Sequence, residues 1–415
     1  MAIAITEYPQ LNNLSFGLGQ DVSQDLKELV KVVSIFVPKS KIHKWLINKR
    51  LKEVVTDSTI QNELIAAIDT DPILITWKQL TGTRTKGEAN SLVQAVFPGQ
   101  GQRLAIVDWA AQNYVSVAVA FGLLEFHRVS KSFTITDLGI QAVQLYESGN
   151  EVALDDFLYQ RLLEYPYTAW LLRLLGENPS KQFSKFDLGG NFGFIDEPGF
   201  DTAPVEIFLN GIAQAKIDQD AEAEKKIKSN FESTSDKYMR WLAGVLVASG
   251  LANSTTKKVS HTYNGRTFEI TLGAVYQITP KGLTALKQVN GKSRYPRSKK
   301  RVMWEFFATK DKKAIAKKTT RSLILKHLSE KKNPLKASEI SKMINSDYPS
   351  LEVTPEEVLD DCIGINRIGI QIDIVDDKLT LKESLYDFEI PIQKNVVLEK
   401  TEIDKFKNKL RSELD

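Results

Sequence analysis

Apolar and polar positions follow the same order three times along the chain: a helix with an apolar stripe, a glycine, and two short strands. The first copy closes its helix at Phe121–Leu123, and strands are predicted at Leu124–Val129 and Phe133–Thr136. Thr136 also stands where an N-cap is needed, so a second helix is predicted to begin at Asp137.

The second and third copies repeat this order with other turn residues. In the second, Ser249–Leu251 closes the helix, Asn264-Gly265 is a hairpin turn signal, and Thr279-Pro280 supplies an N-cap and a first helical residue. The third copy is shorter: Gly369 precedes a hairpin with its turn at Asp376-Asp377. The chain therefore contains three related units.

A helix, a glycine break and a hairpin form the order of a winged helix. We predict a mainly α fold with small β wings, of the α+β class, made of three tandem winged-helix (helix-turn-helix) subdomains. Their predicted bounds are 1–150, 151–292 and 293–388. Such a unit either reads DNA with the helix before its wing or serves only to dock other proteins.

The helix before Gly250 predicts a DNA-reading surface at its head. Ser233–Asp236 is a capping-box sequence, and Lys237 and Arg240 follow in the first two turns. Recognition helices contact bases with their N-terminal residues, and Arg can donate two hydrogen bonds to guanine. Each side chain could instead be a surface polar group near a helix cap. Upstream candidates for contacts with cytosine, adenine or phosphate are Glu232, Ser229 and Asn230.

Aligning the closing glycines of the first two units predicts the reader positions of the first. Trp109 and Gln112 then stand opposite Lys237 and Arg240, and Asp108 stands opposite Asp236. Trp109 would press against a thymine methyl or a sugar, although an aromatic residue there could also belong to the core. Flanking loop residues that could reach phosphates or base edges are Arg84, Lys86, Gln100 and Arg103.

In the third unit the same alignment predicts a surface that does not bind DNA. Glu356 and Leu359 take the reader positions, and four carboxylates lie within Thr354–Asp361. Phosphates would repel this helix, because affinity for duplex DNA comes largely from neutralising backbone charge. We therefore expect the third unit to contact another protein or domain.

Charge is distributed unevenly along these 415 residues. Residues 292–332 hold 15 Lys or Arg and three acids, a net of +12, whereas the whole chain carries only +3. A basic block of this kind suits a polyanionic partner, or it is a solvated connector.

Composition and motifs exclude several other classes of protein. Apolar residues make up 42% without a run of eighteen, which excludes a membrane span, and the first 20 residues lack a signal peptide. The single Cys362 favours a reducing cytoplasm. There is no Walker A sequence, no full dinucleotide fingerprint and no triad motif, so no catalytic residue, metal or cofactor is assigned.

Short carboxylate-x-Lys strings leave one enzymatic alternative open. They could be the core of an unrecognised nuclease metal site, but Asp and Lys are also good turn residues. The strings are Asp311–Lys313, Glu330–Lys332 and Asp376–Lys378.

Several longer strings resemble the DNA-recognition half of type IIS restriction endonucleases of the FokI family, in collinear order over nearly the whole chain. They are Leu80–Thr83, Phe186–Gly189, Phe192–Phe194, Ser235–Tyr238 and Lys300–Glu305. The resemblance implies two subdomains that read an asymmetric site of the GGATG type and a third held against a nuclease domain. It implies a bacterial restriction-modification system and a monomer on double-stranded DNA.

The same resemblance assigns contact positions residue by residue. In the second subdomain they fall on Glu232, Lys237 and Arg240, and an Asn of the family stands at Ser229 or at the adjacent Asn230. In the first subdomain Trp109 and Gln100 match. The family's loop arginine corresponds to Arg84 or Lys86, and its amino-terminal Gln-Asn pair appears as Gln20-Asp21.

The last residues, 389–415, are expected to be a linker toward a nuclease domain that the chain does not contain. Phe388–Pro391 and Lys405–Arg411 look like the family's approach to that domain, and its magnesium-dependent cleavage motif has no counterpart here. The chain would be a recognition fragment or a protein that binds without cutting. The remaining alternatives are a winged-helix transcription or replication regulator and a nuclease with an unrecognised metal site.

Overall fold

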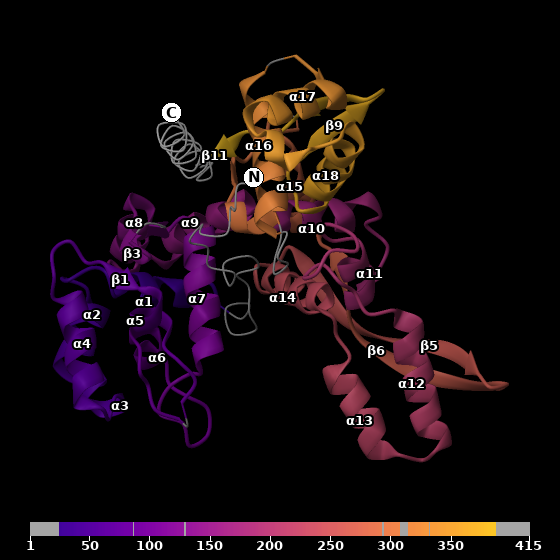
Figure 1. The fold of residues 1–415 in the computed structure, drawn as a ribbon. Helices are drawn as coiled ribbons and strands as arrows, with labels where there is room; N and C mark the ends of the chain where they lie inside the picture. Colours follow the sequence, from indigo (N-terminus) through magenta and orange to yellow (C-terminus); the bar gives the residue numbers. More distant parts are fainter. Residues whose placement is uncertain are drawn as a thin grey trace, which may run out of the picture.

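Two lobes and an upper body make up the protein in the computed structural model (Figure 1). The first lobe (25–148) and the second lobe (183–291) point downward, and the upper body (294–386) lies above the second lobe. Helices α9 (Glu151–Glu164) and α10 (Pro166–Glu177) connect them. The residues described are 25–85, 87–127, 130–292, 294–307, 314–331 and 333–386.

The first lobe is a helical unit with one small sheet. Its strands are β1 (Ile75–Thr76), β2 (Leu124–His127) and β3 (Ser132–Ile135), and its helices are α1 (Glu28–Ser34), α2 (Lys41–Trp45), α3 (Leu51–Val54), α4 (Ser58–Ile68), α5 (Trp77–Thr81), α6 (Leu92–Val96), α7 (Asp108–Ala120) and α8 (Asp137–Glu147). The second strand was predicted at Phe133–Thr136, one residue too late, because β3 begins at Ser132 and the Thr136 hydroxyl caps α8 by accepting from the Gly139 N–H at 3.0 Å.

The second lobe carries a much longer hairpin and an extra pair of helices. Its strands are β4 (Phe183–Ser184), β5 (Ala252–Tyr263) and β6 (Arg266–Ile278), and its helices are α11 (Lys185–Gly190), α12 (Val205–Ile217), α13 (Ala221–Asn230), α14 (Thr234–Ala248) and α15 (Pro280–Asn290). The predicted turn at Asn264-Gly265 and the N-cap at Thr279 are confirmed. Figure 1 shows α12 beside the outer part of the hairpin, and α13 lies next to α12.

The upper body repeats a smaller version of the same arrangement. Its strands are β7 (Lys300–Arg301), β8 (Leu335–Lys336), β9 (Ile372–Val375), β10 (Lys378–Leu381) and β11 (Leu385–Tyr386), and its helices are α16 (Ala314–Glu330), α17 (Ala337–Asp347) and α18 (Pro355–Arg367), with short 3-10 turns at Trp304–Phe307 and Pro349–Leu351. Asp376 and Asp377 form the predicted turn, both with positive φ.

Three sheets have one common topology. In each, the second strand of the hairpin lies in the middle, between its hairpin partner and a two-residue strand from earlier in the chain: β1-β3-β2, β4-β6-β5 and β8-β10-β9. The closing glycines Gly122, Gly250 and Gly369 all have positive φ (73°, 71° and 100°), a conformation that L side chains rarely adopt. The internal repeat predicted from the sequence is confirmed at this level.

A chain of aromatic rings joins the three parts. Tyr165, between the connecting helices, lies 6.0 Å from Phe121 at the end of α7 and 4.9 Å from Tyr167. Tyr167 in turn lies 5.0 Å from Phe192 of the second lobe and 5.0 Å from Phe306 of the upper body. These rings belong to one continuous apolar core, so both lobes are built on a shared base.

A second apolar core is confined to the outer part of the second lobe. Phe208 and Ile212 of α12 and Ile270 of β6 are buried there, and Ile227 of α13 and Phe231 pack against them. Aromatic contacts of 5.6 Å between Phe208 and Phe231 and 5.4 Å between Phe186 and Phe208 connect it to α11. The α12–α13 pair and the long hairpin therefore support one another.

The basic stretch at 292–332 is only partly a surface feature. Lys300, Lys318 and Arg321 are buried. Lys300 donates to the Leu163 carbonyl at 3.1 Å, Lys318 lies 5.2 Å from the Trp304 ring, and Arg321 binds Glu197 and Asp361. For these three cations both earlier interpretations, a polyanion site and a solvated connector, are wrong. Lys300 and Arg321 hold the upper body onto α9 and the second lobe, whereas Lys318 lies inside the upper body.

Candidate nucleic-acid interface

The head of α14 is fixed by a buried aspartate. The predicted capping box at Ser233 and Asp236 is confirmed, with the Ser233 N–H donating to Asp236 Oδ2 at 3.1 Å. Asp236 is fully buried and also accepts from the Thr202 hydroxyl at 2.5 Å and the Ala203 N–H at 2.9 Å. One carboxylate therefore joins the loop after α11 to the first turn of α14.

Three charged side chains form a network beside this head, which we call the Glu232 cluster: Glu232, Arg240 and Lys185. Arg240 Nε and Nη2 donate to the two carboxylate oxygens of Glu232 at 2.7 and 3.2 Å. Lys185 Nζ donates to Glu232 Oε1 at 3.1 Å and to the Phe231 carbonyl at 2.9 Å. Burial alone would raise the pKa of Glu232, but Arg240 and Lys185 lower it overall.

The other predicted contacts of the second lobe lie on its surface. Lys237 is exposed, and its Nζ lies 4.9 Å from the ring of the buried Trp241, one turn further along α14. Ser229 and Asn230 are the exposed last residues of α13. Both residues that could correspond to the family's Asn therefore lie close to Glu232 in the chain, at the same exposed helix end.

The head of α7 is built differently. Its N-cap is Val107, which has no side-chain capping bond, and Asp108 is the first helical residue. Asp236 is the third residue of α14, so the expected equivalence of Asp108 with the cap at Asp236 is wrong: α7 begins later relative to its closing glycine. Trp109 is 48% exposed, which contradicts its alternative as a core residue.

Polar candidates of the first lobe gather around Trp109. Gln100, Arg103 and Trp109 line one pocket of about 470 Å³ beneath the head of α7. Gln112, one turn further on, is half-buried, and Arg84 is exposed in the loop after α5. Gln20, Asp21 and Lys86, together with the linker predicted at 389–415, lie outside the described residues.

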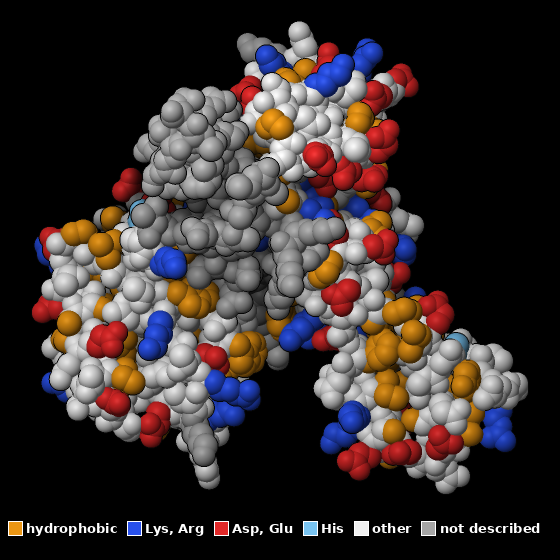
Figure 2. Space-filling model, in the orientation of Figure 1, with side chains coloured by type: hydrophobic (Ala, Val, Ile, Leu, Met, Phe, Trp, Pro, Cys, Tyr) orange, Lys and Arg blue, Asp and Glu red, His pale blue; other side chains and the backbone are white. Residues whose placement is uncertain are grey.

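The two heads belong to lobes that diverge from one base. In Figure 1, α7 and α14 lie on the sides of their lobes that face each other. Open space separates the lower ends of the two lobes in Figure 2. The candidate interface is therefore not a closed pocket but two helix heads on one shared apolar base.

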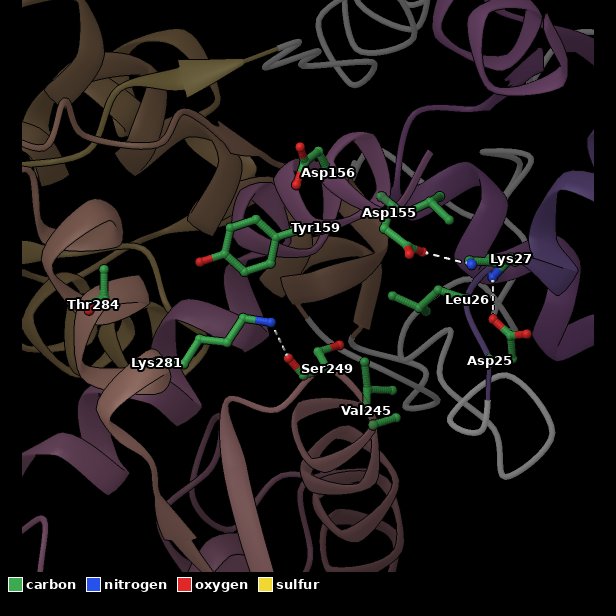
Figure 3. Close-up of a pocket in the computed structure, with 12 residues that line it drawn as sticks. Asp25, Leu26, Lys27, Asp155, Asp156, Tyr159, Val245, Ser249, Lys281 and Thr284 are labelled. Carbon is green, nitrogen blue, oxygen red and sulfur yellow. Dashed lines mark hydrogen bonds and ion pairs between the residues drawn. The ribbon is translucent and has the colours of Figure 1, made fainter. Parts of the chain in front are cut away.

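Cations also lie at the far ends of both helices. Lys281 of α15 donates to the Ser249 carbonyl at the end of α14, at 2.9 Å, and Figure 3 shows this bond in a pocket of about 500 Å³ that Tyr159 and Asp155 also line. At the end of α7, the Arg301 guanidinium lies close to Gly122. A cation at a helix C-terminus is favourable because it neutralises the exposed carbonyl dipoles.

The corresponding helix of the upper body has a different use. Glu356, predicted at a reader position of this unit, is exposed at the head of α18. Further along, Asp361 binds Arg321, which also binds Glu197 of the second lobe, and Arg367 donates to the Gly190 and Asn191 carbonyls at 2.7 and 2.9 Å. Burial raises the pKa of Asp361 to about 6 against the charge of Arg321. This helix is thus packed on the second lobe.

Metal chemistry finds no support in the part of the chain that is described. No group of three or more His, Cys, Asp or Glu side chains there could hold a metal ion. Asp376 and Lys378 lie at the exposed turn of the third hairpin. Nor does any helix of the described ranges have the length and apolarity to cross a membrane.

Two stretches of the chain match families of recognition domains. Residues 15–145 match "FokI, recognition domain, subdomain 1" and residues 155–294 match "FokI, recognition domain, subdomain 2". The chain belongs to the FokI and StsI family of type II restriction enzymes and covers the recognition part of that family. The resemblance read from the sequence is confirmed.

Individual relatives agree with this membership. The type II restriction enzyme StsI of Streptococcus sanguinis is 75% identical over 414 residues, 100% of this chain and 69% of its own length. The type II restriction enzyme FokI of Planomicrobium okeanokoites is 31% identical over 411 residues, 96% of this chain and 68% of its own.

Solved structures show the same architecture. The structure of restriction endonuclease FokI bound to DNA matches this chain with a TM-score of 0.80 and 29% sequence identity. A second structure of restriction endonuclease FokI matches with a TM-score of 0.80 and 30% sequence identity. Each structural match covers 91% of this chain and 64% of the FokI chain, so the matched residues span less than two thirds of the FokI chain in those structures.

Proposed function

We propose that this chain binds an asymmetric site in double-stranded DNA, with the heads of α7 and α14 in the major groove. The observation that carries the proposal is the pair of helix heads on one shared apolar base, in a family whose solved member is bound to DNA. Two different heads suit an asymmetric site, because a symmetric site calls for two copies of the same head.

The fold supports this proposal as three winged-helix subdomains at 1–150, 151–292 and 293–388. Each of the three sheets adds a hairpin to a helix that ends in a positive-φ glycine, which is the expected order. The hairpins are the wings, and α7 and α14 are the recognition helices. The third subdomain docks on protein rather than DNA, because α18 packs against the second lobe.

Arg240 and Glu232 form the central reading pair. The side-on pair with Glu232 occupies Nε and one hydrogen of Nη2, and the opposite edge of the guanidinium, Nη1 with Nη2, can donate to guanine O6 and N7. Glu232 Oε2 keeps an acceptor position for a cytosine amino group. A G·C pair would then be read from both sides.

Lys237 and Trp109 extend the contact, as do Gln100, Gln112, Arg84 and one of Ser229 or Asn230. We propose a site related to GGATG, bound by a monomer in the bacterial cytoplasm. Cleavage belongs to a magnesium-dependent nuclease domain in the whole enzyme, held against the third subdomain. No catalytic step is assigned to the residues described.

Selection from randomised duplexes tests the proposal directly. The purified chain should enrich one short asymmetric motif without added metal, measured by sequencing after gel-shift selection. A palindromic motif bound by a dimer would favour a transcriptional or replication regulator instead. Cleavage of the selected duplex by this chain with magnesium would favour the nuclease alternative. Failure to enrich any motif would overturn the proposed function.

A further inference from the structure

Lys185 is a largely buried cation that neither the sequence nor the proposed contacts account for. It is the first residue of α11, its side chain is 12% exposed, and its Nζ lies 5.1 Å from the Phe186 ring. A cation in the first turn of a helix is disfavoured by the exposed N–H groups there. Its position therefore does not serve the helix that carries it.

Two neighbouring elements hold Lys185 in place. The capping box of Ser184 and Asp187 fixes the start of α11, and Ser184 pairs with Val275 of the central strand β6. Gly189 of the same helix lies so close to α14 that a Cβ on it would stand 2.2 Å from Asp236 Oδ1. The ammonium is thus delivered from a rigid element to the head of α14.

Its two acceptors belong to the loop that enters α14. Lys185 donates to the Phe231 carbonyl at 2.9 Å and to Glu232 Oε1 at 3.1 Å, and the same oxygen accepts from Arg240 Nε at 2.7 Å. Without Lys185, the largely buried Glu232 would be held by Arg240 alone and would move with it. If Arg240 turns toward a base, Lys185 is the cation that remains bound to Glu232 and keeps it in place.

We propose that Lys185 is a positioning residue for base readout: it anchors Glu232 so that Arg240 is aimed at the DNA with its outer edge presented. This inference rests on the proposed function, because it concerns how the α14 head discriminates bases. Lys185 contacts no nucleotide itself. Its effect should therefore appear in the choice between sequences rather than in affinity for phosphate.

Substitution of Lys185 separates these roles. Binding of wild-type chain, Lys185→Met, Lys185→Arg and the control Lys181→Met is measured by fluorescence anisotropy on the selected duplex and on duplexes with single base-pair changes. Lys181 is exposed four residues earlier, with its Nζ over the Phe183 ring. Lys185→Met should lower the preference for the selected duplex about tenfold at one base pair. Lys185→Arg should restore most of it, because a guanidinium can donate to the same two acceptors.

The salt dependence of DNA binding shows whether Lys185 instead contacts a phosphate. A uniform loss on all duplexes, with the slope of log K against log salt reduced by about one, would mean a phosphate contact and overturn the inference. So would additive losses from Lys185→Met and Glu232→Gln in a double-mutant cycle, because an anchor and its acceptor must be coupled. If Lys185→Met does not fold, Lys185→Gln, with one amide donor group, decides the same comparison.

Failure of the inference and failure of the proposed function are distinguishable. A wild-type chain that selects no motif removes the proposed function. A wild-type chain that selects a motif, with Lys185→Met discriminating equally well, removes only the role of Lys185.

Discussion

The heads of α14 and α7 occupy matching places in their lobes but prepare for contact in different ways. At α14 a buried aspartate and the Glu232 cluster set the side chains before any partner arrives. At α7 the cap is Val107, and the most prominent group is the half-exposed ring of Trp109 above loop residues. Charged side chains held by their neighbours make directional hydrogen bonds, whereas an exposed aromatic ring offers apolar contact area that depends less on the exact geometry of the partner.

Truncation at α14 should therefore cost more than truncation at α7. Removing one member of a buried network leaves its partners unsatisfied, and this penalty adds to the lost contact. Removal of an exposed ring leaves no buried polar group without a partner, so this penalty does not arise. The following substitutions test this difference, in decreasing order of the effect expected for the variant that each comparison names first.

Asp236→Ala against Asp108→Ala compares the aligned acidic residues of the two helix heads. Asp236→Ala should lower the free energy of unfolding by roughly 2 to 4 kcal/mol, because three donors lose their acceptor. Asp108→Ala should cost less than about 0.5 kcal/mol, since this residue only adds negative charge to a first turn. Urea denaturation measures both. Equal losses would show that the heads are supported alike.

Arg240→Ala against Gln112→Ala compares the aligned reader positions. The first should weaken binding to the selected duplex by about 1 to 3 kcal/mol and relax the choice at one base pair. It also leaves Glu232 with Lys185 as its remaining cation. The second should cost less, because Gln112 is uncharged and hydrogen bonds from neutral groups contribute less than those from charged ones. Anisotropy titrations on duplexes with single base-pair changes measure the loss of affinity for both variants. An equal loss on every duplex would show that Arg240 contacts a phosphate and not a base.

Glu232→Gln tests the pH dependence of the α14 head. The pKa of Glu232 is lowered in the folded chain, so its stabilising contribution is present above its ordinary value near 4.5 and is lost as pH falls through the folded pKa. Wild type should be more stable than the variant by on the order of 1 kcal/mol near pH 7, with the advantage shrinking in acid. Thermal unfolding at several pH values measures it. A difference that does not change with pH would contradict the ion-pair network.

Trp109→Ala should have the smallest effect on the fold. Binding should weaken by about 1 kcal/mol through lost contact area, whereas the melting temperature should barely change because the ring is half-exposed. Trp241→Ala is the matched variant at α14, where the ring is buried, and it should destabilise the fold by roughly 3 to 5 kcal/mol. A large drop in melting temperature for Trp109→Ala would contradict this prediction and show that the ring contributes to the core.

Local signals were sufficient for much of the fold and for the surface of the α14 head. The capping box at Ser233, the turn at Asn264-Gly265 and the cap at Thr279 each depend on neighbours within a few residues, and each is confirmed. The pairing of Lys185 with Glu232 joins residues 47 positions apart, so no periodicity could predict it. Alignment on the glycines failed at Asp108 because helices that end alike need not begin alike.

The separate apolar core at the tip of the second lobe has a consequence for how this family can diversify. Because α12, α13 and the outer hairpin stabilise one another, substitutions there are insulated from the shared base. Ser229 and Asn230 lie at the end of that module. On the proposed function, substitutions at these two residues should change the preferred DNA sequence while the shared base keeps its shape.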